Sequence, residues 1–416
     1  MALKRNIGAM LSSSALAQAI SLAALPVLAT LYTPSQFGSL AIYLAYIECL
    51  QAFMTLRFEW LLPGLRSKRL TRSVTWLAFT TAAGVALLAA LALHCLSAQM
   101  LQIPQDDSTT FRFVLPAALA FTVLDNVSTA RLVQGGQLGW VARARLVRSF
   151  TSPASAVVLA YALAGEHPNG LILGALCASI VCAFTLRHGA QRVAPQLARM
   201  PRLAELVAAA KHLGRRAAVA TTVSSLNVAS FNLVPILIVA RFDAHGAGLL
   251  FLAQRAATAP AGLVSNSMSL SFWAESARLY RESPQELRAK YLQFTFHLAG
   301  LGLLVAIAIV CAALGLRVVL ADTVWYEATP IIVAFIPMAW GMLTFSGLAH
   351  LIVLGRHHYQ LFADGMRLFL IVTSIYASWH FSLSLLWTVV LLSLSSLVGH
   401  VCLFFAHLKA YREHGA

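Results

Sequence analysis

Twelve long apolar segments, separated by short polar connections, restrict the fold of this chain more than any other feature. Each is close to the roughly 20 residues that a helix needs to cross a bilayer. Because lipid cannot satisfy backbone hydrogen bonds, segments of this kind cross the membrane as helices. The sequence therefore predicts an all-α polytopic membrane protein with about 12 transmembrane helices. The segments are approximately 10–31, 37–63, 73–97, 111–134, 146–164, 170–187, 217–240, 247–273, 292–316, 328–354, 359–380 and 383–406.

The distribution of charge predicts the orientation of these helices. The chain is 59% hydrophobic and 11% charged, which excludes an ordinary soluble domain. Its net charge of +15 would suggest nucleic-acid binding in a soluble protein. Here most of the 30 Lys and Arg residues lie at the termini and in the connections after even-numbered segments, whereas the other connections hold only Arg112, Arg241 and Arg317. Cytoplasmic loops carry such an excess, so both termini are expected in the cytoplasm.

The longest polar connection lies near the middle of the chain. It divides the sequence into an expected N-terminal six-helix bundle at 1–190, a basic cytoplasmic linker with an amphipathic segment at 191–213, and a C-terminal six-helix bundle at 214–416. A weak internal similarity relates the halves, since a proline inside one segment precedes a glycine that opens the next in both. The pattern favours two pseudo-symmetric bundles around a central cavity, as in transporters built from repeats. The pairs are Pro26 with Gly38 and Pro235 with Gly248.

Charged residues inside the apolar segments are the candidate functional residues, because each costs roughly 3 kcal/mol at the centre of a span. In the second segment, Glu48 and Glu59 are 11 residues apart and would share a face of a continuous helix. Arg57 would then lie opposite Glu48. The alternative is that Arg57 and Glu59 extend to the cytoplasmic interface.

The fourth segment carries Asp125, with Thr129 one helical turn later on the same face. This carboxylate is either a protonatable coupling site or the partner of a buried arginine. Arg131 lies nearer the cytoplasmic end, where it is either a substrate contact or an interfacial residue.

The second half of the chain contributes two further candidates. Gln254 and Arg255 lie within the eighth segment, and Arg255 is the best candidate for binding an anionic group because it lies far from either interface. In the eleventh segment Asp364 and Arg367 are spaced i,i+3, which allows either a functional site or a self-neutralising pair.

Two stretches resemble a known family. Residues 31–43, LYTPSQFGSLAIY, are followed by LRFEWLLPG at 56–64, with Arg57-Phe58-Glu59 near the end of the second segment. Together with 252–260 and 272–275, they resemble the bacterial polysaccharide exporters and lipid-linked oligosaccharide (O-antigen type) flippases. These form part of the multidrug/oligosaccharidyl-lipid/polysaccharide (MOP) flippase superfamily.

The resemblance implies a transporter that works by alternating access. Its substrate would be an undecaprenyl-diphosphate-linked oligosaccharide, moved to the periplasmic leaflet of the bacterial inner membrane for O-antigen, capsule or exopolysaccharide synthesis. It implies a monomer without cofactor, metal or nucleic acid, and a polysaccharide polymerase and a chain-length regulator as candidate partners. The expected substrate contacts are Arg255, Arg57, Arg131 and Gln254, and the candidates for ion coupling or gating are Asp125, Glu48, Glu59, Asp364 and Arg367.

Other functions remain open from the sequence. A drug or organic-cation antiporter of the same superfamily would favour acidic residues in the cavity, against which Arg255 argues. A membrane-embedded glycan polymerase or sugar transferase would normally need a large periplasmic loop, whereas the connections here are short. The sequence has no Walker A, HExxH or GxSxG motif, and its six cysteines form no CxxC pair. We therefore expect a protein that is not an enzyme.

Overall fold

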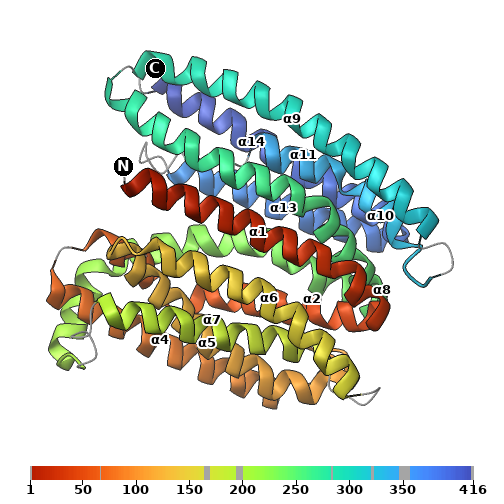
Figure 1. Cartoon of the computed structure of the whole chain (residues 1–416), viewed down its shortest axis with the longest axis horizontal. Helices are drawn as coiled ribbons and strands as arrows, with labels where there is room; N and C mark the ends of the chain where they lie inside the picture. The colour runs from red at the N-terminus through yellow and green to blue at the C-terminus, as the bar shows by residue number, and fades with distance from the viewer. Residues whose placement is uncertain are drawn as a thin grey trace. The chain divides into compact units, whose positions relative to one another are not determined.

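The computed structural model describes residues 2–65, 67–163, 169–193, 200–282, 284–319, 323–345 and 357–413, which are helical almost throughout and include no strand. The chain divides into two compact units, Met1–Val228 and Ala229–Ala416 (Figure 1). The predicted all-α polytopic fold is confirmed. In their described parts, all twelve predicted segments fall on helices; residue 164 of the fifth and residues 346–354 of the tenth lie outside the described part.

The N-terminal unit is a bundle in which α1 packs on α6, α6 on α7, α7 on α5, and α5 on both α2 and α4 (Figure 1). The start of α2 follows from its sequence, because Thr33 and Gln36 form a capping box and Pro34 occupies the first turn. The helices are α1 (Ala2–Leu31), α2 (Pro34–Met54), α3 (Phe58–Leu61), α4 (Lys68–Cys95), α5 (Ser108–Gln134), α6 (Leu138–Ala162) and α7 (Gly170–Val193), with short 3₁₀ turns at Leu62–Gly64 and Gln105–Asp107.

The second predicted segment is not one continuous helix. Leu56 and Arg57 have φ values of 46° and 53°, so the chain leaves the helix after Met54 and resumes it at Phe58. The expectation that Glu48 and Glu59 share a helix face was therefore wrong, because the helical phase does not continue across Thr55–Arg57.

One long helix, α8 (Leu203–Glu282), crosses the boundary between the units. It contains the seventh and eighth predicted segments as two arms that meet at Asp243, whose φ of 65° and ψ of −174° are not helical. The Asp243 carboxylate accepts a hydrogen bond from the backbone N–H of Gly246 at 3.1 Å, which caps the second arm. The expected linker partly coincides with the first turns of α8, where Glu205 pairs with Arg69 and Arg72 of α4.

The C-terminal unit contains the greater part of α8 and the remaining helices. In this unit α14 packs against α13 and α11, and α9 against α10 and α11 (Figure 1). At the end of the predicted spans, α9 and α14 remain packed through Tyr291, which stacks on Phe404 and His407. The helices are α9 (Pro284–Val319), α10 (Ala328–Ala334), α11 (Ile336–Phe345), α13 (His357–His380) and α14 (Leu385–Glu413).

Within the described residues, nine helical segments are long and apolar enough to cross a membrane. One of them, Leu203–Gly262, contains most of both arms of α8, and the apolar part of α1, Ala15–Leu31, is shorter than the others. Nine such segments are found in the part of the chain that the structure describes instead of the twelve predicted from the sequence, partly because two predicted spans merge into one helix.

Candidate functional site

A polar network inside the N-terminal unit is centred on Asp125 of α5. Its Oδ2 accepts a hydrogen bond from Arg148 of α6 at 3.2 Å and a weaker one from the Cys182 thiol of α7 at 3.6 Å. Oδ1 accepts from the Thr129 hydroxyl at 3.4 Å, as their shared face predicts. The Asp125 side chain is 16% exposed and that of Arg148 is 46% exposed. The carboxylate is therefore enclosed, whereas its cationic partner is accessible.

A second set of hydrogen bonds joins the neighbouring Asn126 to α2. The Asn126 amide donates to Gln51 at 3.5 Å, and the Gln51 amide in turn donates to the carboxylate of Glu48. Adjacent residues of a helix point about 100° apart, so Asp125 faces α6 and α7 while Asn126 faces α2. Two of the predicted coupling residues, Asp125 and Glu48, thereby belong to two separate sets of hydrogen bonds that adjacent residues of α5 anchor, one toward α6 and α7 and the other toward α2.

Arg57 and Glu59 lie in the break between α2 and α3. Their side chains are only 8% and 3% exposed and form an ion pair of 3.4 Å. The Thr55 hydroxyl donates to Glu59, and the Arg57 guanidinium lies 4.8 Å from the centre of the Trp60 ring. Both charges are therefore buried within the protein and paired with each other rather than extended into solvent. The buried Nε of Arg57 has no hydrogen-bond partner, and its left-handed backbone is strained for a residue with a side chain.

Asp364 and Arg367 of α13 form a buried pair in the C-terminal unit, as their i,i+3 spacing predicts. The charged atoms are 3.1 Å apart and both side chains are 5% exposed. Arg367 also donates to the Ser230 hydroxyl of α8 at 3.0 and 2.6 Å and lies 4.1 Å from the centre of the Phe231 ring. These contacts tie α13 to the first arm of α8.

The other expected substrate contacts differ in exposure. Arg255, on the second arm of α8, is exposed, and its guanidinium lies 5.3 Å from the centre of the Phe251 ring. Gln254 lines an internal cavity of about 20 Å³, roughly the size of a single water, beside Ser230 and Ser396. Arg131 is half-buried on α5. Of these residues, only Arg255 presents an exposed charge.

The partner of Asp125 was not predicted from the sequence, although a signal for it was present. Asp125 lies nine residues before α5 ends at Gln134, and Arg148 lies ten residues after α6 begins at Leu138. At 1.5 Å per residue these positions are about 14 and 15 Å from a short turn, hence at equal depth in antiparallel helices. Arg148 lies at the very start of the fifth predicted segment, 146–164, next to a basic connection, so it was not among the predicted site residues. Ser230 carried no comparable signal, because a serine in a span is unremarkable.

Solved structures define the class of fold. The chain matches a multidrug resistance MATE family transporter of the MOP superfamily in its inward-facing conformation, with a TM-score of 0.68, 12% identity and coverage of 98% of this chain and 96% of that one. The lipid II flippase MurJ in an inward closed conformation matches with a TM-score of 0.64 and 12% identity, over 97% of this chain and 88% of that one. A MOP superfamily transporter from Pyrococcus furiosus matches with a TM-score of 0.57 and 13% identity, over 98% of this chain and 95% of that one. The protein thus has the fold of the MOP superfamily transporters.

The family is identified from the sequence itself. The family of polysaccharide biosynthesis proteins matches residues 27–330, and because this is more than half of the chain, the protein belongs to that family. No curated protein sequence matches it. The predicted relationship is thus confirmed for the family by the sequence match and for the fold by the MOP superfamily structures, and both agree with a multi-pass membrane protein.

Proposed function

We propose that the protein moves an undecaprenyl-diphosphate-linked oligosaccharide from the cytoplasmic to the periplasmic leaflet of the bacterial inner membrane, for synthesis of a surface polysaccharide. The observation that carries this proposal is the combination of a polysaccharide biosynthesis family with a transporter fold that the lipid II flippase MurJ shares. The substrate is anionic, so its outward movement is favoured by an inside-negative potential, by about 2.3 kcal/mol per charge per 100 mV. A surface glycan such as O-antigen, capsule or exopolysaccharide fits this role.

Arg255 is the proposed contact for the diphosphate. Its guanidinium is exposed on α8, and a guanidinium can bind two phosphate oxygens at once. Arg131 and Gln254 are proposed as weaker polar contacts. The burial of Arg57 and its pairing with Glu59 favour a gating role for both over direct contact with substrate.

Asp125 and Glu48 are the proposed coupling groups. Arginine does not lose its proton in proteins, so Asp125 can exchange its partner for a proton or a cation only if Arg148 moves away. The exposure of Arg148 supports such an exchange, since water can solvate the released guanidinium. Asp364 and Arg367 are proposed to hold α8 and α13 together rather than to exchange ions. A polysaccharide polymerase and a chain-length regulator remain proposed partners, with the protein acting as a monomer.

A cation-coupled antiporter of organic cations is a second candidate. The observation that favours it is the presence of two carboxylates, Glu48 and Asp125, whose hydrogen-bond partners lie within the N-terminal unit. The exposed Arg255 disfavours a cationic substrate.

Flipping of a fluorescent lipid-linked oligosaccharide in proteoliposomes tests the proposal. We expect Arg255→Ala to lower the rate at least about tenfold, as loss of a charge-assisted phosphate contact of about 1.5–3 kcal/mol implies. The matched control is Arg112→Ala, an exposed arginine at the start of α5, which should retain the rate. Unchanged flipping by a well-folded Arg255→Ala variant would refute the anion site, and uptake of organic cations without flipping would favour the antiporter.

A further inference from the structure

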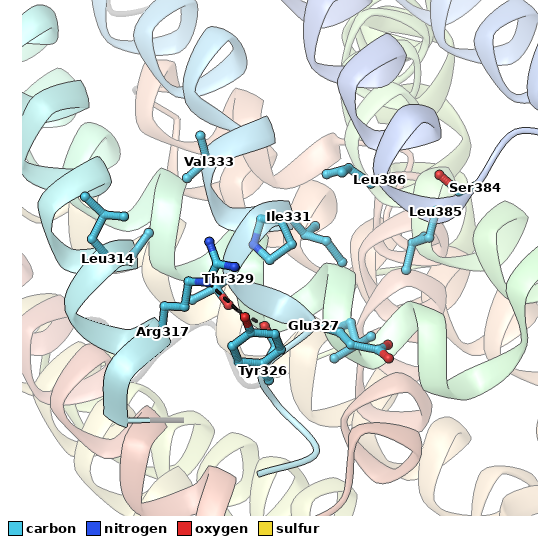
Figure 2. A pocket seen from close by; sticks show the side chains of 13 residues that line it. Leu314, Arg317, Tyr326, Glu327, Thr329, Ile331, Val333, Ser384, Leu385 and Leu386 are labelled. Carbon is cyan, nitrogen blue, oxygen red and sulfur yellow. Dashed lines mark hydrogen bonds between the residues drawn. The ribbon is translucent and has the colours of Figure 1, made fainter. Parts of the chain in front are cut away.

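A cavity of about 410 Å³ lies in the C-terminal unit where the end of α9, the start of α10, the start of α14 and the second arm of α8 meet (Figure 2). Its volume falls within the range of about 300–1,000 Å³ typical of small-molecule sites. Most of its lining is aliphatic, from residues such as Leu249, Leu314 and Leu385, and Arg317, Tyr326 and Glu327 supply polar groups.

The helix ends around the cavity carry the residues typical of a membrane–water interface. Tyr326 precedes α10, Trp379 and Phe381 lie at the end of α13, and Trp387 lies in the first turn of α14. All four side chains are exposed. Aromatic residues gather in this way at the level of lipid headgroups. The predicted orientation assigns this end of the unit to the periplasmic leaflet.

Two opposite charges line the cavity without neutralising each other. The Nε of Arg317 donates to the Tyr326 hydroxyl at 3.0 Å, which positions the guanidinium, and its terminal nitrogens form no ion pair with a carboxylate in the described part of the chain (Figure 2). Glu327 is exposed, and these two described residues form no ion pair within 4.0 Å of each other. A ligand that offers a phosphate to Arg317 and an ammonium to Glu327 would satisfy both charges.

The aliphatic lining continues onto the outer face of α9. Leu303, Ile307 and Leu314 are exposed and share one helix face, since they are spaced by four and seven residues. From Arg317 to Leu303 the helix rises about 21 Å, compared with about 15 Å for half of the hydrocarbon core. This face is therefore long enough for an acyl chain whose headgroup lies at Arg317.

We propose that this cavity binds a phospholipid with an ethanolamine headgroup, with its phosphate on Arg317, its ammonium on Glu327 and one acyl chain between α9 and α10. A purely anionic lipid fits less well because Glu327 repels it. The same repulsion disfavours the diphosphate of a transported glycan lipid. The site is therefore distinct from the transport site proposed at Arg255.

Native mass spectrometry of the full-length protein with dioleoyl phosphatidylethanolamine or dioleoyl phosphatidylglycerol tests this site. We expect the ethanolamine lipid to bind about tenfold more tightly than the glycerol lipid, because one favourable charge contact replaces one repulsion. Arg317→Ala should weaken both lipids about tenfold, and Glu327→Gln should remove the preference between them. Val333→Trp, which fills the aliphatic part, should reduce binding without changing any charge.

The controls remove an exposed charge elsewhere, through Arg112→Ala in α5 and Glu286→Gln in the first turn of α9. Both should leave lipid binding and preference unchanged. Equal binding of the two lipids by the unmodified protein would overturn the proposal. So would undiminished binding by a monodisperse Arg317→Ala variant, or displacement of the bound phospholipid by a lipid-linked oligosaccharide.

Discussion

At the scale of single residues, the structure depends on charged side chains that are buried inside the protein and paired with other polar groups. Arg367 is positioned by Asp364, by Ser230 and by the Phe231 ring. Its aliphatic stem passes directly over Gly399 of α14, where a Cβ atom would lie 2.6 Å from the Arg367 Cβ. A glycine is therefore required at this position because of close approach, and the need for it was not visible in the sequence.

Gly399→Ala is expected to destabilise the C-terminal unit by about 1–3 kcal/mol, because the added methyl group overpacks the contact with Arg367. Thermal unfolding of the detergent-solubilised protein measures the effect. Gly365→Ala is the matched control, since a Cβ at this α13 position meets nothing within 4 Å. Equal unfolding temperatures for the two variants would contradict the proposed tight contact.

The Asp125–Arg148 pair can be tested with a double-mutant cycle of Asp125→Asn and Arg148→Gln. We expect a coupling energy of about 1 kcal/mol, reduced from that of a fully buried pair because half of the Arg148 side chain is exposed. Chemical denaturation of the four proteins provides the measurement. Additive effects of the two substitutions would show that the observed 3.2 Å contact contributes no stability.

At the scale of elements, the main departure from expectation is the break between α2 and α3. Leu56 and Arg57 adopt left-handed backbone conformations, which cost roughly 1–2 kcal/mol for residues with side chains. The buried Arg57–Glu59 pair and its contact with Trp60 lie directly at the break. Strain of this kind persists only where surrounding contacts enforce it.

Replacing Leu56 with glycine should relieve part of this strain. We expect Leu56→Gly to be neutral or to stabilise the protein by up to about 1 kcal/mol, because glycine adopts positive φ without penalty. Leu87→Gly, at an exposed position inside α4, should instead destabilise by about 1 kcal/mol. Changes of opposite sign in the unfolding temperatures of the two variants would support the left-handed backbone at Leu56, whereas equal destabilisation would indicate that Leu56 is helical in solution.

Patterns with a fixed period predicted most of the helices and some of the site. The length of the apolar segments predicted where the helices lie. The i,i+3 and i,i+4 spacings predicted the Asp364–Arg367 and Asp125–Thr129 contacts. The break at Leu56 was missed because Thr55–Arg57 contains neither glycine nor proline, the residues that usually mark such points. Contacts between distant segments, such as Arg367 with Ser230, depend on packing and leave no local signal.

At the scale of the whole molecule, α8 is the element common to both units. Its first turns belong to the N-terminal unit, where Glu205 contacts Arg69 at 2.8 Å and Arg72 at 3.0 Å. Its later residues include Ser230 and Gln254 of the C-terminal unit. The polar segment that the sequence presents as a linker thus includes residues that dock onto α4.

Glu205→Gln should weaken this docking and lower the unfolding temperature, because a neutral amide loses both ion pairs. The loss should be largest in dilute buffer and should shrink as salt rises to about 1 M, where the screening length falls to about 3 Å. Glu286→Gln, at an exposed position of α9, serves as the control. A difference that does not depend on salt would mean that Glu205 acts through packing rather than charge.

The equal depth of Asp125 and Arg148 has a consequence for how the chain enters the membrane. They lie on consecutive helices joined by a short turn, so α5 and α6 can partition from the translocon as one hairpin. Inserted singly, each helix would expose a charge that costs roughly 2.5–3.5 kcal/mol near the centre of a span. Inserted together, the two helices would enter the lipid with that pair neutralised, so we expect the contact seen in the folded protein to make insertion of the hairpin less costly than insertion of either helix alone.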